Sequence, residues 1–277
     1  MIVSIASGKG GTGKTTVAVS LALAAQDVTL LDADVEEPNA NILLHAQINS
    51  VKKATVPFPE VDLNKCDFCE ECSKFCAYNA IVVLKGLKVF AVPEMCKSCG
   101  GCVLVCPQKA IKEVPREIGY IRHGEKDKIK FIDGDLNVGE SFATPLIRQL
   151  FDFVEGGDII VDCPPGAAHP MVESVRRADF VVLVTEPTPF GIHDLKEALI
   201  ITDSLNKKVG IVVNRADIGD EEVRKLAKER EIPILAEIPY DDRIAKWYSQ
   251  GQAPVAMSSE WRDKFVELWR KIKALSS

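Results

Sequence analysis

Residues 7–16 read Ser-Gly-Lys-Gly-Gly-Thr-Gly-Lys-Thr-Thr and follow a short apolar run, Ile2–Ala6. The stretch contains the pattern G-x-x-x-x-G-K-[ST] in full. Glycines in such a loop let backbone N–H groups close around phosphate oxygens, while the lysine reaches the terminal phosphates and the threonine hydroxyl joins a magnesium shell. We expect a strand before the loop and a helix over residues 15–25, and this order is the context that a phosphate-binding loop requires. The predicted nucleotide-binding residues are Gly8, Gly10, Gly11, Thr12, Gly13, Lys14, Thr15 and Thr16, with Thr15 also a magnesium ligand.

The composition of the chain limits the classes of function. At 277 residues the chain can bury a substantial core, and one large domain with one small domain is the natural expectation. The formal net charge of −6 gives no basic field, so direct binding of nucleic acid is not expected. No apolar segment is long enough to span a bilayer, and the N-terminus passes into a strand without a charged leader. We therefore expect a cytoplasmic protein.

Acidic residues follow two of the expected strands. Residues 28–31 form an apolar run that leads into Asp32-Ala33-Asp34, and residues 158–162 end in Asp162. Acids at the carboxyl ends of parallel strands lie where open α/β sheets bind their ligands. Further apolar runs and helical patterns alternate along the rest of the chain, at residues 180–185, 193–205, 208–213, 220–231 and 234–238. The alternation predicts an α/β fold with a doubly wound, mostly parallel sheet.

These motifs together resemble the MinD/ParA/nitrogenase-iron-protein group of P-loop ATPases, including its Mrp-type members. The deviant phosphate-binding loop of that group has a lysine, matched here by Lys9, that crosses a dimer interface to the partner's phosphates. The alternative for Lys9 is a solvated loop lysine. The D-x-D segment before Pro38 and Asn39 resembles the first switch of the group. The resemblance implies that Asp34 orients or activates the attacking water and that Asp32 lies nearer the magnesium shell, whereas the alternative for Asp32 is a strand-end cap.

Later motifs match the same group. The segment from Asp162 to Gly166 resembles the second switch, which implies that Asp162 holds magnesium through water and that Gly166 lies beside the terminal phosphate. Asn214 follows an expected strand and matches the adenine-recognition position, with a turn residue as the alternative, and Pro239 lies in a segment that resembles the loop closing over the base. The resemblance implies a homodimeric, magnesium-dependent ATPase that binds ATP and ADP and hydrolyses slowly until a partner stimulates it. The implied catalytic residues are Lys9, Lys14 and Asp34.

Eight of the nine cysteines lie between Cys66 and Cys106. In a reducing compartment clustered cysteines hold metal more often than they form disulfides. They form two copies of C-x-x-C-x-x-C-x-x-x-C offset by 30 residues, which implies two copies of one small unit packed by pseudo-two-fold symmetry. The pattern resembles a bacterial-type ferredoxin, in which the fourth cysteine of each run binds the other cluster. The predicted ligands are Cys66, Cys69, Cys72 and Cys106 for one 4Fe-4S cluster, and Cys96, Cys99, Cys102 and Cys76 for the other.

Three features of the cysteines leave alternatives. Pro107 follows Cys106 as the ferredoxin pattern expects, whereas Ala77 stands where proline is usual and would loosen or retune one cluster. Zinc is the competing metal, although structural zinc sites generally use two separated pairs of ligands. Cys163 lies outside the repeat, and we interpret it as a small buried side chain in preference to a redox or cluster residue.

The predicted organisation is a discontinuous ATPase domain, residues 1–56 plus 116–277, with a small α+β ferredoxin-like domain inserted at residues 57–115. The insert lies between the two switch segments at Asp34 and Asp162. We therefore expect the bound nucleotide to alter the orientation or exposure of the insert. At the C-terminus, apolar residues from Trp261 to Leu275 recur at helical spacing. We expect this helix to cover the sheet, with an interfacial membrane helix as the less favoured alternative.

Three functions are compatible with the combined resemblances. We favour a dimeric ATPase that couples nucleotide state to electron transfer through two 4Fe-4S clusters to a redox partner. The first alternative is an Mrp-type carrier or assembly ATPase that gives clusters to a client protein. Those carriers hold a transferable cluster at a C-x-x-C near the C-terminus, and no cysteine follows Cys163 here. The second alternative is a MinD/ParA-like positioning ATPase with structural or sensory clusters, for which the chain lacks a basic DNA-binding patch.

Overall fold

The computed structural model describes residues 1–276, which divide into two compact units. The first unit contains Met1–Lys52, Ile121–Asp135 and the chain from Ile147 onward, and the second contains Lys53–Tyr120 and Leu136–Leu146. The boundaries expected at residues 57 and 116 fall inside strands β3 (Gln47–Val61) and β6 (Ile111–Lys126). The chain therefore passes between the units along continuous strands. Pro57 and Pro59 lie within β3, which is an edge strand of its sheet. Proline has no N–H to donate to a neighbouring strand, and an edge strand tolerates it because one side of the strand has no neighbour.

Within residues 1–276, the main sheet has nine strands in the order β11-β10-β9-β1-β8-β2-β7-β6-β3. The strands not yet bounded are β1 (Ile2–Ala6), β2 (Thr29–Asp32), β7 (Ile129–Leu136), β8 (Ile159–Asp162), β9 (Phe180–Thr185), β10 (Lys208–Asn214) and β11 (Ile234–Ile238). From β11 to β7 every neighbouring pair runs parallel. The expectation of an α/β fold with a mostly parallel sheet is confirmed.

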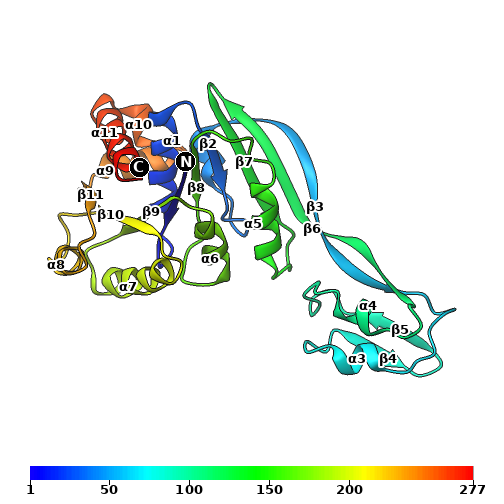
Figure 1. Ribbon diagram of the computed structural model, residues 1–277. Coiled ribbons are helices and arrows are strands. Elements are labelled where there is room, and N and C mark those ends of the chain that lie inside the picture. Colours follow the sequence, from blue (N-terminus) through cyan, green and yellow to red (C-terminus); the bar gives the residue numbers. More distant parts are fainter. Residues whose placement is uncertain (277) are drawn as a thin grey trace. The chain divides into compact units, whose positions relative to one another are not determined.

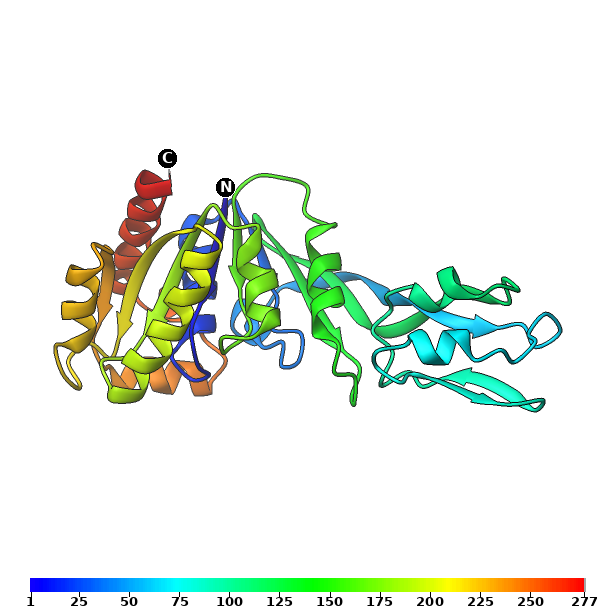
Figure 2. The ribbon, with the colours of Figure 1, turned by 60° about the horizontal axis from the view of Figure 1, so that its bottom comes forward.

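Helices cover both faces of the sheet, as Figures 1 and 2 show. Helix α1 (Lys14–Ala25) packs with α10 (Pro254–Met257) and α11 (Ser259–Ser276), while α6 (His169–Arg176) and α7 (Pro189–Ser204) pack against β1 and β9 on the other face. This double cover explains why β2, β8 and β9 consist entirely of buried residues, as central parallel strands do. The remaining helices of the first unit are α2 (Ala40–Leu44), α8 (Glu222–Glu229) and α9 (Asp242–Ser249), and α5 (Ala143–Phe151) spans both units.

The structure shifts the start of one expected helix and confirms the packing of another. Helix α7 begins at Pro189, four residues before the expected start at 193, because Pro189 suits the first helical position and the Thr188 hydroxyl accepts a hydrogen bond from the Gly191 amide. In α11 the apolar stripe is buried, with Trp261, Phe265 and Ile272 each at most 3% exposed. The helix therefore covers the core, as expected. Among residues 1–276, no helix is long and apolar enough to cross a membrane.

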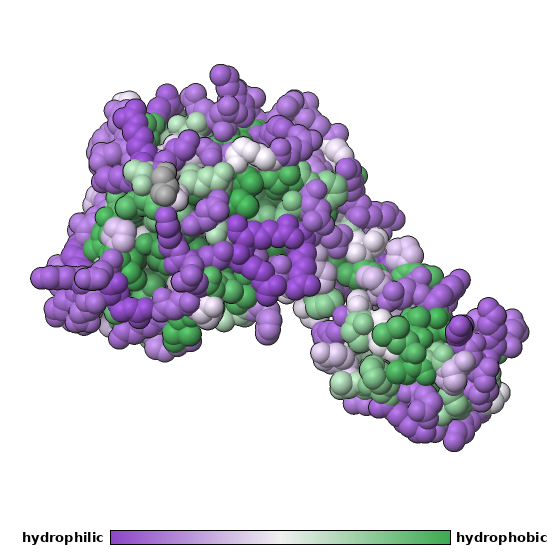
Figure 3. Space-filling view, in the orientation of Figure 1, coloured by the Kyte–Doolittle hydropathy of each residue, from purple (hydrophilic) through white to green (hydrophobic). Residues whose placement is uncertain are grey.

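The second unit repeats one local structure. It contains a hairpin of β4 (Ile81–Leu84) and β5 (Lys88–Ala91) and two one-turn helices, α3 (Glu71–Phe75) and α4 (Gly101–Val105). Three pairs of residues 30 positions apart share a left-handed backbone conformation, with φ between 47° and 71°: Phe68 and Ser98, Glu70 and Gly100, Asn79 and Lys109. The repeat seen in the sequence is thus also a repeat of backbone geometry. Figure 3 shows apolar side chains gathered on part of the surface of this unit.

Candidate functional site

The phosphate-binding loop connects β1 to α1. Gly13 adopts φ +90° directly before the helix, a conformation that glycine reaches without strain. A Cβ atom at this position would lie 2.5 Å from the Asn214 Nδ2 atom, so the loop and the end of β10 approach each other too closely for a side chain. The Asn214 amide donates a hydrogen bond of 2.8 Å to the Thr12 carbonyl. The predicted adenine-recognition residue is therefore held against the predicted phosphate loop.

Lys14 is the first residue of α1 and is almost fully buried. Its ammonium lies 3.2 Å from a carboxylate oxygen of Asp162 and 4.0 Å from one of Asp34. Burial alone lowers the pKa of Lys14, but the charges of Asp162 and Asp34 outweigh it and raise the pKa above its ordinary value. The lysine is therefore charged at neutral pH. It is placed at the start of the helix where the amide groups of α1 also attract phosphate.

The two switch acids occupy different environments. Burial raises the pKa of Asp34 to about 6, and the positive charge of Lys14 opposes that rise. A carboxyl group with a pKa close to neutral is suited to accepting a proton from water. Asp162 is completely buried at the end of β8, and among the described residues its Oδ2 atom has no hydrogen-bond partner. A buried carboxylate oxygen without a protein partner is suited to a water molecule or a cation.

Asp32 has a structural role in this arrangement. Its Oδ1 atom accepts a hydrogen bond from the Asp34 amide at 3.1 Å, and its Oδ2 atom accepts one from the Ala40 amide at 3.0 Å. Both oxygens therefore hold the segment that carries Asp34, which favours the strand-end cap over direct contact with magnesium. Burial, followed by the neighbouring charge of Asp162, raises the pKa of Asp32 well above its usual range.

A further buried acid, Asp133 within β7, lies in register with Asp32 and was not predicted from the sequence. Asp133 pairs in register with Asp32, which in turn pairs with Asp162 across β2 and β8. Asp133 is 1% exposed, and Arg122 on β6 binds both of its oxygens, at 2.8 and 2.7 Å. Arg122 also contacts Asp135 at 3.3 Å. The row of buried carboxylates at this edge of the first unit is thus balanced at one end by Lys14 and at the other by Arg122.

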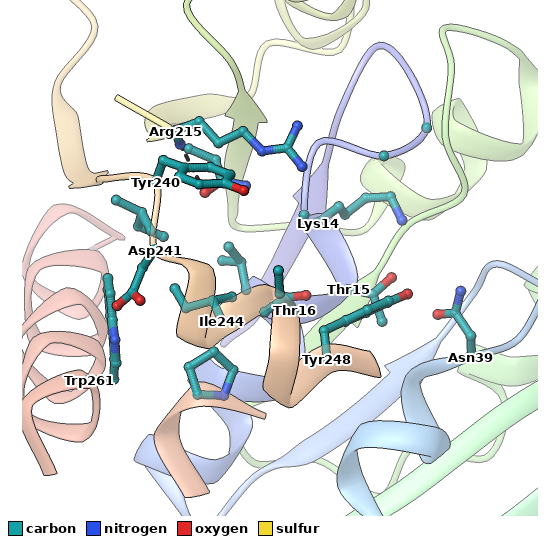
Figure 4. A pocket seen from close by; sticks show the side chains of 18 of the residues that line it. Lys14, Thr15, Thr16, Asn39, Arg215, Tyr240, Asp241, Ile244, Tyr248 and Trp261 are labelled. Carbon is teal, nitrogen blue, oxygen red and sulfur yellow. Dashed lines mark hydrogen bonds between the residues drawn. The ribbon is translucent and has the colours of Figure 1, made fainter. Parts of the chain in front are cut away.

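A cavity of about 400 Å³ opens next to the phosphate loop. Figure 4 shows that its wall combines Lys14, Thr15 and Thr16 with side chains from the loop after β11 and from helices α9 and α11. Pro239 and Tyr240 line it, as expected for the segment predicted to close over the base. Its size lies in the range of small-molecule sites, and its mixture of polar loop and aromatic wall suits a nucleotide. Residues beyond the predicted set also line it, namely Asn39, Arg215, Asp241, Ile244, Tyr248 and Trp261.

Lys9 does not line this cavity and forms an ion pair with Glu186. Their charged atoms are 3.8 Å apart, and the Lys9 side chain is 30% exposed. Gly166 in the predicted second switch has φ +88°, and its amide donates a hydrogen bond to the Ser7 carbonyl at 3.2 Å. The second switch is therefore joined by its backbone to the start of the phosphate loop.

The second unit gathers its eight thiols in two groups of four. One cavity, of about 180 Å³, is lined by Cys76, Cys96, Cys99 and Cys102. A smaller one, of about 10 Å³, is lined by Cys66, Cys69, Cys72 and Cys106. Each group combines three cysteines of one repeat with the fourth cysteine of the other. Among residues 1–276, no three His, Cys, Asp or Glu side chains form a group of the kind that ligates a single metal ion.

The fourth cysteine of each repeat has the same hydrogen bond. The Cys76 sulfur accepts the Ala80 amide and the Cys106 sulfur accepts the Ala110 amide, both at 3.3 Å. Burial raises the pKa of Cys102 to about 11, so a metal has to displace its proton on binding. Cys163 is completely buried, and burial raises its pKa to about 12, which supports the structural interpretation of this thiol.

Two functional candidates escaped the sequence analysis, although the signal of one of them was present. Glu186 directly follows β9, the same signal that identified Asp34 and Asp162, whereas Asp133 lies within β7. Their partners, Lys9 and Arg122, become apparent only when the strand order is known. The rule that acids at strand ends mark the ligand edge of the sheet applies to Glu186.

Comparisons with known proteins agree with this geometry. The chain is 29% identical over 260 residues to an uncharacterised protein of Methanocaldococcus jannaschii, with 91% of each chain covered. It is 23% identical to an iron-sulfur cluster carrier protein of the same organism, over 97% of this chain and 82% of the relative. The fold resembles that of the septum site-determining protein MinD from Pyrococcus horikoshii, solved in complex with Mg-ADP. The TM-score is 0.60 at 18% identity, over 100% of this chain and 97% of that one.

The family assignment follows from a match to nearly the whole chain. Residues 3–255 match the model of the CobQ/CobB/MinD/ParA nucleotide-binding domain. The matched range contains the phosphate-binding loop, the two predicted switch acids and the predicted adenine-recognition residue. The chain belongs to the CobQ/CobB/MinD/ParA family of P-loop nucleotide-binding proteins.

Proposed function

We propose that the chain is a dimeric ATPase whose nucleotide state controls electron transfer through two 4Fe-4S clusters in its second unit. The crossed grouping of the eight thiols carries this proposal. Each cavity of the second unit is lined by three cysteines of one repeat and by the fourth cysteine of the other. Two-cluster ferredoxins distribute their ligands in this way, whereas structural zinc sites generally use two separated pairs.

In the proposed reaction the nucleotide phosphates lie against the amides of residues 8–13 and the N-terminus of α1. Lys14 neutralises charge on the terminal phosphates. Thr15 and Asp162 would hold a magnesium ion, which supplies further positive charge at the phosphates, and the free Oδ2 atom of Asp162 fits that role. Asp34 orients the attacking water and accepts its proton. Lys9 of a second subunit completes the charge balance at the phosphates, as the resemblance to MinD-like ATPases implies.

The proposed cluster ligands differ in the room around them. The group that contains Cys76 lines a cavity of about 180 Å³, which fits a bound cluster, while the group that contains Cys106 encloses about 10 Å³, so its side chains must separate to admit one. The amide hydrogen bonds to Cys76 and Cys106 remain available to ligated sulfur, where such bonds help to set the reduction potential. Each cluster would supply one-electron chemistry.

An anaerobic redox titration tests the proposal. The chain is reconstituted with iron and sulfide, assayed for the content of two clusters, and titrated with ADP or with a nonhydrolysable ATP analogue. We expect the reduction potential or the rate of electron transfer to differ between the two nucleotides. The matched control is Lys14→Ala, which weakens phosphate binding and should remove the difference. Identical potentials and rates with both nucleotides in the unmodified chain would contradict the coupling of ATP to electron transfer.

Transfer of whole clusters is a second candidate, and the relatives favour it. The chain is similar to proteins named as iron-sulfur cluster carriers, at 23% and 26% identity. The reconstituted chain is therefore mixed with an apo-ferredoxin as acceptor, with and without ATP. A carrier loses iron and sulfide to the acceptor in an ATP-dependent manner. An electron-transfer protein keeps its own clusters in this assay, and in a parallel assay it reduces an acceptor that already contains its cluster. The iron content of the two proteins after separation therefore distinguishes the two functions.

A further inference from the structure

The two groups of thiols in the second unit differ in their surroundings, although the repeat that forms them is regular. The cavity of about 180 Å³, here called the open site, is lined by Cys76, Cys96, Cys99 and Cys102. The cavity of about 10 Å³, here called the closed site, is lined by Cys66, Cys69, Cys72 and Cys106. Residues 30 positions apart occupy corresponding places in the two sites, as the shared left-handed backbone of Phe68 and Ser98 shows. Their side chains can therefore be compared one against one.

The first difference is a hydroxyl group. Ser98 lines the open site, and Phe68 lines the closed site at the corresponding position. The Ser98 Oγ atom is shielded from solvent and, among residues 1–276, has no hydrogen-bond partner. A buried hydroxyl without a protein partner is suited to donate to a group bound in the cavity that it lines. Phe68 has no polar atom in its side chain and packs against the apolar core of the unit. The open site therefore has a side-chain donor for sulfur where the closed site has an apolar ring.

The second difference is the charge of the residue that follows the first cysteine of each repeat. Asp67 lines the closed site, whereas Lys97 lines the open site. The ammonium of Lys97 lies 5.2 Å from the centroid of the Phe142 ring, a contact that helps to fix its position. Asp67 also accepts a hydrogen bond from the Cys69 amide at 3.2 Å. Lysine has no acceptor, so Lys97 does not compete with ligand sulfur for the Cys99 amide.

The other charged residues around the two sites do not cancel this difference. Glu113 lines the open site and balances its lysine. At the closed site Glu70 is paired with Lys85 at 3.4 Å, whereas the side-chain partner of Asp67 is the neutral amide of Gln108, at 3.0 Å. The closed site therefore keeps a negative charge in excess, while the charges beside the open site balance.

Reduction of a 4Fe-4S cluster adds one negative charge to its site. Apolar surroundings and neighbouring negative charge oppose this addition, because both destabilise the added charge. Hydrogen bonds to the sulfur atoms stabilise the added charge and raise the reduction potential. At the open site the Ser98 hydroxyl and the Lys97 charge both favour reduction. At the closed site the charge of Asp67 and the apolar wall both oppose it.

We propose that Ser98 and Lys97 give the open site the higher reduction potential, so that a single electron taken up by the chain is held there. This inference rests on the proposed function, in which both sites bind a 4Fe-4S cluster. An electron that enters at the closed site then passes to the open site, so the closed site is oxidised by one electron and the open site is reduced by one. The open site is accordingly the place from which a redox partner takes the electron.

The test is an anaerobic spectroelectrochemical titration of the whole reconstituted chain without nucleotide. We expect two one-electron potentials at least about 59 mV apart, which corresponds to an about tenfold preference of the electron for one cluster. Ser98→Ala and Lys97→Met should each lower the higher potential alone, and Asp67→Asn should raise the lower potential alone. The matched control is Lys88→Met, because the Lys88 ammonium also lies 5.2 Å from a ring centroid, that of Phe90, but Lys88 lines neither site. This control should change neither potential.

The iron and sulfide content of each variant is measured first, so that loss of a cluster is not mistaken for a shift in potential. If Ser98→Ala loses iron, Ser98→Gly replaces it, because glycine adopts the φ of 54° at this position without strain. Equal potentials in the unmodified chain, or a higher potential that neither the Ser98 nor the Lys97 variant lowers, would overturn the inference and leave the proposed function intact. An unmodified chain that binds fewer than two clusters would overturn both. Because nucleotide is absent, a failure of coupling to ATP would leave this inference intact.

Discussion

Replacing Arg122 with methionine tests the row of buried carboxylates. Arg122 binds both oxygens of Asp133, and Asp133 is 1% exposed. Methionine keeps much of the length of the side chain but provides no hydrogen-bond donor. The carboxyl group of Asp133 would remain buried, next in register to Asp32 and without its cation. Breaking one partner of a buried ion pair costs about 3–5 kcal/mol.

The ability of Asp133 to take up a proton limits this loss. From an ordinary pKa of 3.8, keeping the carboxyl group neutral at pH 7 costs about 4 kcal/mol, at ~1.4 kcal/mol per pH unit. Burial already raises the pKa of Asp133 while Arg122 is present, so part of this cost exists in the unmodified chain. We therefore expect Arg122→Met to lower the free energy of unfolding by about 3 kcal/mol at pH 7.

The pH dependence separates this explanation from a simple loss of packing. A carboxyl group whose pKa is raised by folding destabilises the folded state at high pH, and this penalty shrinks as the pH falls from the folded pKa toward the unfolded pKa. The loss caused by Arg122→Met should consequently be smaller at pH 5 than at pH 7. Adding Asp133→Asn removes the charge and should recover most of the stability at pH 7.

Urea unfolding followed by tryptophan fluorescence is the appropriate assay. The three tryptophans, Trp247, Trp261 and Trp269, all belong to the first unit, so their signal reports on the unit that contains Arg122 and Asp133. Urea adds no salt, which would screen the charges. An equal loss at pH 5 and pH 7, or no recovery on adding Asp133→Asn, would show that an unpaired carboxylate is not the cause.

Three further predictions concern the proposed site. Gly13→Ala forces a side chain into a left-handed conformation, at a cost of about 1–2 kcal/mol, and brings its Cβ atom against the Asn214 amide. The affinity for ADP, measured by calorimetry, should therefore fall at least about tenfold. An unchanged affinity would refute the close approach of Gly13 and Asn214. For ATP hydrolysis, kcat/KM should fall about tenfold per pH unit below pH ~6, because Asp34 takes up a proton. The residual activity of Asp34→Asn should not show this decrease at low pH. Cys76→Ala should lower the iron and sulfide content after reconstitution, whereas Cys163→Ala should leave it unchanged; equal effects would contradict the ligand assignment.

The features that a sequence can predict are those whose chemistry is local in the chain. The phosphate-binding loop is such a feature, because a strand, a glycine-rich turn and a helix need no information about distant residues. The same holds for the acids after β2 and β8, since parallel strands of one sheet present their carboxyl ends at one edge. The spacing of the cysteines within one repeat is equally local, so the sequence predicts the ligands of each proposed cluster.

Features that depend on how the chain folds could not be predicted from the sequence. Asp32 looked like a candidate near magnesium, but its oxygens bind the amides of Asp34 and Ala40, which depends on how the chain turns after β2. Glu186 meets Lys9 only because β9 lies next to β1 in the sheet. The boundary expected at residue 57 falls within β3, an edge strand that accommodates Pro57 and Pro59. Strand order decides the contact of Glu186 with Lys9 and the edge position of β3, and a single sequence does not contain it directly.

The balance of charge at the phosphate loop gives a last prediction, on magnesium. Two acids, Asp34 and Asp162, lie within 4.0 Å of the ammonium of Lys14, and burial raises the pKa of Asp34 to about 6. A proton taken up by Asp34 removes negative charge beside the proposed magnesium site at Asp162, so binding of the cation weakens as the pH falls. With ADP held constant, added Mg²⁺ should raise the melting temperature more at pH 8 than at pH 5.5.

The pH dependence of the nucleotide itself has to be separated from that of the protein. Asp162→Asn serves as the control, because it removes the carboxylate whose Oδ2 atom has no partner among the described residues, while ADP keeps its own protonation. Any effect of pH on Mg-ADP as a ligand persists in this variant, whereas competition at the protein carboxylates is reduced. A stabilisation by Mg²⁺ that depends on pH equally in both chains would place the competing protons on the nucleotide. A dependence confined to the unmodified chain would place them on the acids beside Lys14.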